Sequence, residues 1–503
     1  MTADSAATPS PVVLGVVAAY LGACLFVGLR AKGRASDTAA GYVAGDRALG
    51  TLVMYFITGA TIFSAFAFLG APGWAYDRGA AAFYILGFGI LGFVPFYFVG
   101  PRAARLGREF GFVTQAEMVA HRFRMPALAG VMALISTLAF VPYLALQMKG
   151  AGYVLSAATG GWLSVPIGAA VTYAIVLVYV LSSGVLGVGW TNTLQGIFMM
   201  VLAWTLGLWI PSLLHGGVGE MFERIAALDP DHLRVPGYAA GGKERWSQSG
   251  FVSAILVSAL GFSFWPHLFM KAFTARSEAT LRRTVVLYPT FQLFLVPLLI
   301  VGFAGVLFES APARADEILP HMLVNIPELP PIVVGLFCAG ALAASMSSGD
   351  AIVHASASIL VRDGLVRSLG RKLEPSAERR AIRVAVVLMA LLAYGMAVKT
   401  EQAIAVLLLY AYGPVVQFTP AVIATLYWRR ATGHGVLWGL LAGLATNVLF
   451  EVAPDWRPFP LHAGLFGLAV NVATLAIVSL AARNRAASAT DEFLAVARGD
   501  ASP

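Results

Sequence analysis

Residues 340–351 read GALAASMSSGDA, and this stretch decides how the rest of the chain is interpreted. Small residues, adjacent hydroxyls and a carboxylate lie within an apolar run of helix length, where polar side chains are costly. A helix presents Ala344, Ser347 and Ser348 on one face, because they are three and four positions apart. Their hydroxyl and carbonyl oxygens could form half of a cation site, or the small residues could form a seam for close helix packing. Both interpretations stay open on this stretch alone.

The composition around this stretch is typical of a membrane protein. Of the 503 residues, 58% are hydrophobic and only 12% are charged, unlike any water-soluble protein of this size. Apolar runs of about 20 residues predict thirteen membrane-spanning helices, centred on 12–29, 50–76, 80–101, 127–157, 162–182, 187–212, 249–270, 284–308, 331–360, 383–399, 402–427, 435–451 and 462–482. We therefore predict an all-α polytopic membrane protein with a single embedded domain.

The distribution of basic residues predicts the orientation in the lipid bilayer. An odd number of spans places the two termini on opposite sides of the membrane. With the N-terminus outside, the inner loops and the C-terminal tail contain most of the 34 lysines and arginines, as the positive-inside rule requires. We predict a multi-pass protein of the cell (inner) membrane with a cytoplasmic C-terminus.

Several other classes of protein and site are excluded by the sequence. The net charge of +8 follows from membrane topology, and no soluble basic surface for nucleic acid is present. Cys24 and Cys338 lie in apolar segments without a disulfide, zinc or redox spacing. No phosphate-binding GxxxxGK[ST] loop and no catalytic motif is found. We predict that the protein is not an enzyme and has no organic cofactor, nucleic-acid partner or obligate protein partner.

Two of the predicted spans contain residues that interrupt a helix. The second span carries three glycines and Pro72, and the seventh carries Gly261 and a Trp-Pro-His step at 265–267. Proline removes a backbone donor and glycine weakens a helix, so each span is predicted to contain an unwound section with free carbonyls. Interruptions at corresponding places in two halves are typical of the midplane site of an inverted-repeat transporter. Ordinary helix kinks are the alternative.

Four motifs in this order resemble the sodium:solute symporter family, and the resemblance covers nearly the whole chain. They are GYVAGDRALG (41–50), ATIFSAFAFLGAPGWAYDRG (60–79), GWTNTLQG (189–196), and GALAASMSSGDA (340–351) followed by ILVRDGL (359–365). The resemblance implies a LeuT-like core of two inverted five-helix repeats, with broken first and sixth core helices. It also implies a secondary active symporter that moves a solute inward with sodium by alternating access.

The same resemblance implies a division of the chain into six segments. They are the N-terminal tail with the first helix and inner loop (1–47), the first repeat (48–212), an outer loop (213–248), the second repeat (249–427), two peripheral helices (428–482) and a cytoplasmic tail (483–503).

The family resemblance also implies the ligands of the coupling ion, sodium. They would be backbone oxygens of Ala60, Phe63 and Ala344 and the hydroxyls of Ser347 and Ser348. Sodium suits a shell of small, hard oxygen ligands. The family commonly has Asp where this chain has Asn192, and an amide lacks the negative charge that assists a cation. Ion identity and stoichiometry therefore stay open.

The solute is predicted to be a small organic acid. Lys149 lies about 15 Å from the outer end of its span, where a solute carboxylate or an ion pair with Asp350 would satisfy its charge. The segments YLALQMK (143–149) and FWPHLFMKAFTARS (264–277) resemble most the bacterial monocarboxylate transporters, which implies a solute such as lactate or pyruvate. Proline, pantothenate and proton-coupled monocarboxylate uptake are alternatives, and a transporter-like solute sensor is an alternative from another class.

Further polar and aromatic residues are predicted to serve the solute or the coupling ion. Those near the solute are Gln147, Thr61, Ser64, Phe264, Trp265 and His267. The aromatic residues among them could close over the solute, or simply pack. Asn192, Gln195, Asp350 and His354 are candidates for coupling or proton relay, because Ser347, Asp350 and His354 follow one helical stripe. The alternative for Asp350 is helix packing through hydrogen bonds, and the alternative for His354 is a position facing water near the inner end of its span.

Overall fold

The computed structural model describes residues 10–30, 47, 49–239, 244–482 and 487–500. Within this part, the regular structure is helical and two isolated β-bridges stand in place of strands. The all-α prediction is therefore confirmed. Most of the motif GYVAGDRALG lies outside the described residues.

The helices of the first half begin with α1 and end at the outer loop. Their bounds are α1 (Pro11–Arg30), α3 (Thr51–Ile62), η3 (Phe66–Gly70), α4 (Ala71–Arg78), η4 (Gly79–Phe83), α5 (Tyr84–Gly92), α6 (Phe96–Phe110), α7 (Gln115–Phe123), α8 (Pro126–Ala158), α9 (Val165–His215), α10 (Val218–Leu228) and η5 (Pro230–Leu233).

The second half repeats the alternation of long and interrupted helices. It contains α11 (Gln248–Phe262), α12 (Pro266–Phe269), α13 (Lys271–Thr274), α14 (Glu278–Gln292), α15 (Leu295–Gly305), η6 (Ala315–Glu317), α16 (Ile318–Asn325), α17 (Pro331–Ile359), η7 (Leu360–Arg367), α18 (Pro375–Lys399), α19 (Ile404–Val415), α20 (Phe418–Tyr427), α21 (Gly433–Val452), η8 (Pro454–Trp456), α22 (Ala463–Ala481) and α23 (Ala487–Arg498).

The described helices provide ten spans long and apolar enough to cross a membrane, or twelve when each bent pair counts as one. The third expected span, 80–101, instead falls on η4, α5 and α6, which are short, and a turn at 93–95 separates α5 from α6. Gly79 ends α4 with a φ of +60° and approaches the carbonyl oxygen of His232 so closely that a Cβ atom would collide with it. The chain is thereby redirected without a long straight helix.

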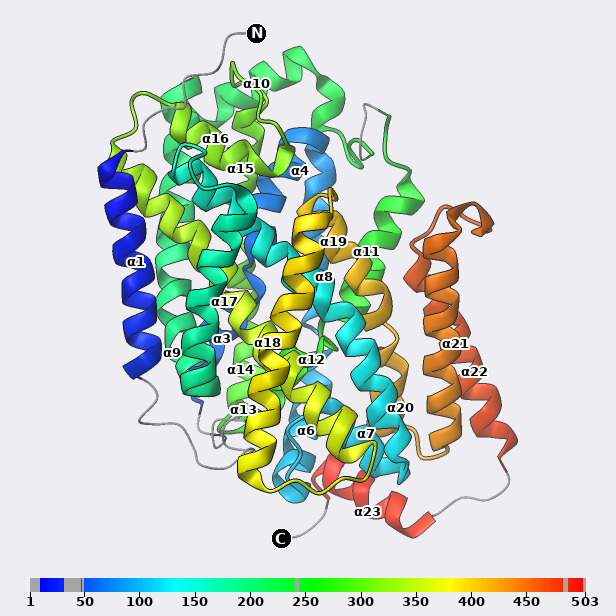
Figure 1. The fold of residues 1–503 in the computed structure, drawn as a ribbon. Coiled ribbons are helices and arrows are strands. Elements are labelled where there is room, and N and C mark those ends of the chain that lie inside the picture. The colour runs from blue at the N-terminus through cyan, green and yellow to red at the C-terminus, as the bar shows by residue number, and fades with distance from the viewer. Residues whose placement is uncertain (1–9, 31–46, 48, 240–243, 483–486, 501–503) are drawn as a thin grey trace.

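The two bent pairs are the spans that the sequence predicts to be broken. The axis bends by 57° between Thr51–Ile62 and Phe66–Gly92, and by 41° between Gln248–Phe262 and Pro266–Thr274. Helices α8 and α17 pack against each other and against α9, while α21 and α22 form a separate pair at one side of the molecule (Figure 1). The broken spans therefore lie against the long, continuous helices.

The two ends of the molecule differ. Helix α1 begins at the end where α10 lies, and α6, α7 and α23 gather at the opposite end (Figure 1). At that opposite end Thr114 caps α7 by accepting from the N–H of Glu117, and the Glu117 carboxylate accepts from the N–H of Val113. This arrangement is a variant of the capping box. It fixes the turn between α6 and α7.

A buried ion pair connects α7, which follows this turn, to η7 and α18. Arg362 of η7 donates to Glu117 through Nε and Nη2, at 3.1 and 2.9 Å, and to Glu378 of α18 through Nη1 at 2.9 Å. The Glu117 side chain is only 2% exposed. Removing one partner from such a pair leaves an uncompensated buried charge, which costs about 3–5 kcal/mol.

Replacement of Arg362 by methionine is therefore expected to lower the thermal unfolding temperature of the purified protein, because Glu117 loses its cation. Adding Glu117→Gln should recover part of the loss by removing the stranded charge. Arg371→Met, at an exposed position of the same connection, is the matched control. Equal destabilisation by Arg362→Met and Arg371→Met would contradict the role of the buried pair.

Candidate ion and solute sites

The first helix break presents backbone carbonyls to α17. The hydroxyl of Ser347 donates to the carbonyl oxygen of Ala60 at 3.0 Å and to that of Ala344 at 3.2 Å. The hydroxyl of Ser348 donates to the carbonyl oxygen of Thr61 at 2.7 Å. All five residues are fully buried. Five neutral oxygens, three from carbonyls and two from hydroxyls, thus converge where the broken span meets a continuous helix.

This cluster matches four of the five predicted sodium ligands. Ala60, Ala344, Ser347 and Ser348 are brought together. The fifth, Phe63, makes no hydrogen bond with either serine among the described residues, and Ser348 reaches Thr61 instead. The sequence predicted Thr61 as a residue near the solute. Its hydroxyl donates to the carbonyl oxygen of Ile57 within its own helix. Hard, neutral oxygens in this number suit a monovalent cation such as sodium.

The N–H groups released by the same break are also satisfied. The N–H of Ala65 donates to Oε1 of Gln147 in α8 at 2.9 Å, and the N–H of Phe66 donates to Oγ of Ser64 at 3.1 Å. Gln147 and Ser64, predicted to contact the solute, therefore hold the unwound backbone. Nε2 of Gln147 is buried and has no hydrogen-bond partner in the described part of the chain.

The four candidate coupling residues lie around α17 and α9. Asn192 donates to the carbonyl oxygen of Ser347 at 3.0 Å, directly behind the oxygen cluster. Asp350 accepts from the hydroxyl of Tyr179 at 2.9 Å. Gln195 donates to the hydroxyl of Tyr20 in α1 at 2.9 Å. His354 is buried one turn beyond Asp350 on α17. Their roles in coupling or proton relay stay predictions.

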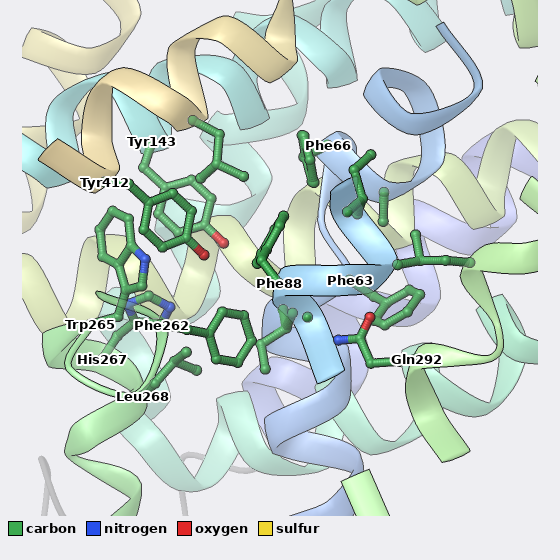
Figure 2. A pocket seen from close by; sticks show the side chains of 16 residues that line it. Phe63, Phe66, Phe88, Tyr143, Phe262, Trp265, His267, Leu268, Gln292 and Tyr412 are labelled. Carbon is green, nitrogen blue, oxygen red and sulfur yellow. The ribbon is translucent and has the colours of Figure 1, made fainter. Parts of the chain in front are cut away.

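A cavity lies between the two helix breaks and is lined mainly by aromatic side chains (Figure 2). The volume that the centre of a water molecule can occupy in this cavity is about 30 Å³, and the total empty volume around it is about 440 Å³. That is enough for a water molecule or two. Its lining comes from both broken spans and from α5, α8, α14, α15 and α19: Ile62, Phe63, Phe66, Ala67, Ile85, Phe88, Gly89, Tyr143, Phe262, Trp265, His267, Leu268, Gln292, Leu295, Leu408 and Tyr412.

Polar groups without partners face this apolar space. His267 is 3% exposed, and neither of its ring nitrogens has a hydrogen-bond partner among the described residues. Oε1 of Gln292 is likewise unpaired, while its amide nitrogen contacts the hydroxyl of Tyr288. Buried polar groups are normally hydrogen-bonded. Such groups in an aromatic cavity indicate a place for a small ligand with its own polar atoms.

Trp265 and His267 are the predicted solute residues that line this cavity. Phe264 lies outside it, and its carbonyl oxygen accepts from Nε2 of Gln115. Lys149 also lies outside it. The Lys149 ammonium donates to the carbonyl oxygens of Gln402 at 2.6 Å and Thr400 at 3.3 Å, in the connection between α18 and α19. The expected alternative partner, Asp350, is not bonded to it.

Sequence reasoning missed Tyr143, Gln292 and Tyr412, which line the cavity from three different helices. Gln292 carried a usable signal, since it is a lone amide within the apolar run 284–308. The tyrosines carried none, because tyrosines of membrane helices usually only pack or lie at the membrane interface.

Comparison with known proteins agrees with this arrangement. The model of the sodium:solute symporter family matches residues 41–443. The uncharacterized symporter YhjB of Bacillus subtilis is 28% identical over 93% of this chain and 96% of its own. A monocarboxylate transport permease of Rhizobium johnstonii is 24% identical over 86% and 89% of the two chains.

The fold has a solved counterpart. The structure of a Na+-coupled sialic acid symporter in a substrate-bound, outward-open state superposes with a TM-score of 0.77 and 19% identity, covering 95% of this chain and 99% of that chain. Similarity at this level of identity supports the LeuT-like fold rather than a particular solute. The family match extends over both helix breaks and over α17, so the chain belongs to the sodium:solute symporter family.

Proposed function

We propose that this protein takes up a small organic acid together with sodium, by alternating access. The observation that carries the proposal is the junction at which Ser347 and Ser348 bridge α17 to the carbonyls of Ala60 and Thr61. A cation bound there would replace hydroxyl donors as the partner of these carbonyls. Membership of the family and the sodium-coupled structural neighbour support sodium as the ion.

Coupling follows from the position of this junction. An ion shifts a conformational equilibrium only if it binds one state better than the other. The oxygens belong to two elements, the broken span and α17, so a relative movement of these elements changes the ion's coordination. The solute cavity shares Phe63 with the same break. Each ligand therefore stabilises an arrangement that the other requires.

The cavity favours a compact solute with an apolar or aromatic body and a polar end. Its polar groups are His267, Gln292, Tyr143 and Tyr412, and no lysine or arginine of the described residues is part of its lining. Lys271 is buried four residues beyond His267, and a cation in an apolar environment favours an anionic group at this end. The solute named for the Rhizobium johnstonii permease is a monocarboxylate, so a monocarboxylate such as lactate or pyruvate is the proposed solute.

The alternatives differ in measurable ways. Proline and pantothenate also carry a carboxylate, and proton-coupled monocarboxylate uptake would need no sodium. A solute sensor would bind without accumulating its ligand. The proposed location is the cytoplasmic membrane, with the α23 end inside because the basic loops gather there.

Uptake by proteoliposomes under separately imposed sodium and proton gradients decides between these functions. An inward sodium gradient is expected to drive accumulation of lactate or pyruvate above equilibrium, with proline, pantothenate and acetate measured in parallel. Accumulation driven only by a proton gradient would overturn sodium coupling. Saturable binding without accumulation under any gradient would indicate a sensor.

The ion site is tested by alanine substitutions at adjacent serines of α17. Ser347→Ala and Ser348→Ala are each expected to raise the sodium concentration for half-maximal uptake by about tenfold or more, since each removes an oxygen ligand. Ser345→Ala is the matched control, because its hydroxyl is equally buried but donates to the carbonyl oxygen of Gln147. Equal shifts at all three positions would indicate a packing seam instead.

The solute site is tested by comparing His267 with Lys149. His267→Phe keeps the aromatic packing and removes both nitrogens, so KM for the solute should rise about tenfold, with partial recovery in His267→Asn. Lys149→Met should change KM by less than about twofold and mainly lower thermal stability, because the ammonium binds the carbonyls of Thr400 and Gln402. The reverse pattern would assign the solute's carboxylate to Lys149.

A further inference from the structure

A second cavity lies at the end of the molecule where α7 and α23 meet. Its lining consists of Phe110 from α6, Ala120, His121 and Arg122 from α7, Arg124 and Pro126 from the turn into α8, Arg367 from η7, and Glu492 and Phe493 from α23. Water-sized molecules can place their centres in about 320 Å³ of it. Neither the transport function nor the family resemblance assigns this cavity a role.

Its lining carries more positive charge than its own acidic group can neutralise. Arg122, Arg124 and Arg367 share the lining with one carboxylate, that of Glu492. Asp491, which is also near Arg122, forms an ion pair with Arg429 at 2.6 Å. Other arginines of this end are already paired, such as Arg362 with Glu117 and Glu378. None of the three cavity arginines makes a salt bridge with the described residues. An excess of unpaired guanidinium groups around a cavity favours an anion.

Arg122 provides the strongest sign that a ligand is missing. It is 8% exposed, and its Nη1 donates to the hydroxyl of Thr490 in α23 at 2.9 Å. Its Nε and Nη2 are buried without a hydrogen-bond partner in the described part of the protein. A charged group buried with unmet donors costs several kcal/mol unless an anion accepts from it. The two free donors are those of a guanidinium edge that can bind an oxyanion bidentately.

The neighbouring His121 lies in the same positive electrostatic environment. Burial and repulsion from Arg367 and Arg124 lower the pKa of His121. The His121 ring lies 4.8 Å from the ring of Phe110 and 6.2 Å from that of Phe493, measured between centroids. The aromatic rings thus form one wall of the cavity, and the three arginines supply its charge.

We propose that this cavity binds a phosphate group through Arg122, Arg124 and Arg367. Two phosphate oxygens can accept hydrogen bonds from the planar donor edge of one arginine, and several arginines together can neutralise the double negative charge of a phosphate group. The group would come either from the headgroup of an anionic phospholipid or from soluble phosphate. Arg122 also donates to the hydroxyl of Thr490 in α23, and Arg367 is the last residue of η7. A bound phosphate group would therefore link α23 to α7 and to η7, which continues α17.

The experiment uses the full-length purified protein and two probes. In detergent, inorganic phosphate is titrated at constant ionic strength against a chloride control, with the thermal unfolding temperature as readout. In parallel, the protein is reconstituted into vesicles of phosphatidylcholine with and without phosphatidylglycerol, and co-purifying lipid is identified by native mass spectrometry. Saturable stabilisation by inorganic phosphate assigns the site to a soluble anion, and selective retention of phosphatidylglycerol without it assigns the site to a lipid.

Arg124→Gln and Arg367→Gln test the assignment without removing an ion pair within the protein. Each should weaken binding of the effective probe by about tenfold, as expected for the loss of one charge-assisted contact. Arg371→Gln, at an exposed position just beyond η7, should leave binding unchanged. The proposal fails if neither probe distinguishes the wild type from the cavity variants, or if Arg371→Gln weakens binding as much as they do.

Discussion

The structure depends on the need to satisfy every backbone polar group where a helix is interrupted inside an apolar environment. Water is absent there, so an unpaired carbonyl or N–H group costs several kcal/mol. At the first break, Ser347 and Ser348 donate to the carbonyls of Ala60 and Thr61, and Gln147 accepts from the N–H of Ala65. At the second break, Gln115 donates to the carbonyl of Phe264 from α7. The polar residues of otherwise apolar helices lie where these interruptions need partners.

Because of this constraint, the same polar groups can satisfy the interrupted backbone and provide ligands for an ion. The hydroxyls that complete the hydrogen bonding of the broken span also complete an oxygen shell, so a small cation can take the place of a donor without creating an unpaired group. All the oxygens are neutral, which avoids burying a carboxylate beside the ion. Asn192 continues this pattern, because its amide donates to the carbonyl of Ser347. The buried carboxylate of this region, Asp350, is held by Tyr179 one turn further along α17.

The sequence was sufficient for features that are local along the chain and insufficient for those that depend on where side chains converge. Proline and glycine located both breaks, and the spacing of Ala344, Ser347 and Ser348 located one side of the oxygen cluster. The sequence did not predict that the carbonyl of Thr61 joins the cluster, because hydrophobicity and spacing do not show whether a residue contributes its carbonyl or its side chain. Lys149 was expected to face the solute from its depth alone, yet its long side chain reaches carbonyls between α18 and α19. The cavity-lining Tyr143, Gln292 and Tyr412 come from helices that are adjacent only after folding.

The two halves of the first broken span are anchored to different parts of the molecule. The half that ends at Arg78 is fixed to the connection between α10 and α11. Arg78 donates to the carbonyl of Tyr238, and the N–H of Tyr238 donates back to the carbonyl of Arg78. The guanidinium lies 3.9 Å from the ring of Trp74 and 4.4 Å from that of Trp246. The other half, α3, follows a β-bridge between Leu49 and Ala275, beside the end of the second broken span. The cavity between the breaks is large enough for one or two water molecules but too small for an organic acid, so a solute must enter through a rearrangement of its lining. Because the two halves are tied to different parts of the molecule, a rotation about residues 63–65 would open the cavity, in the proposed alternating access, while each half keeps its anchors. The carbonyls of Ala60 and Thr61 lie directly beside these residues, so an ion bound at the proposed site would control this rotation.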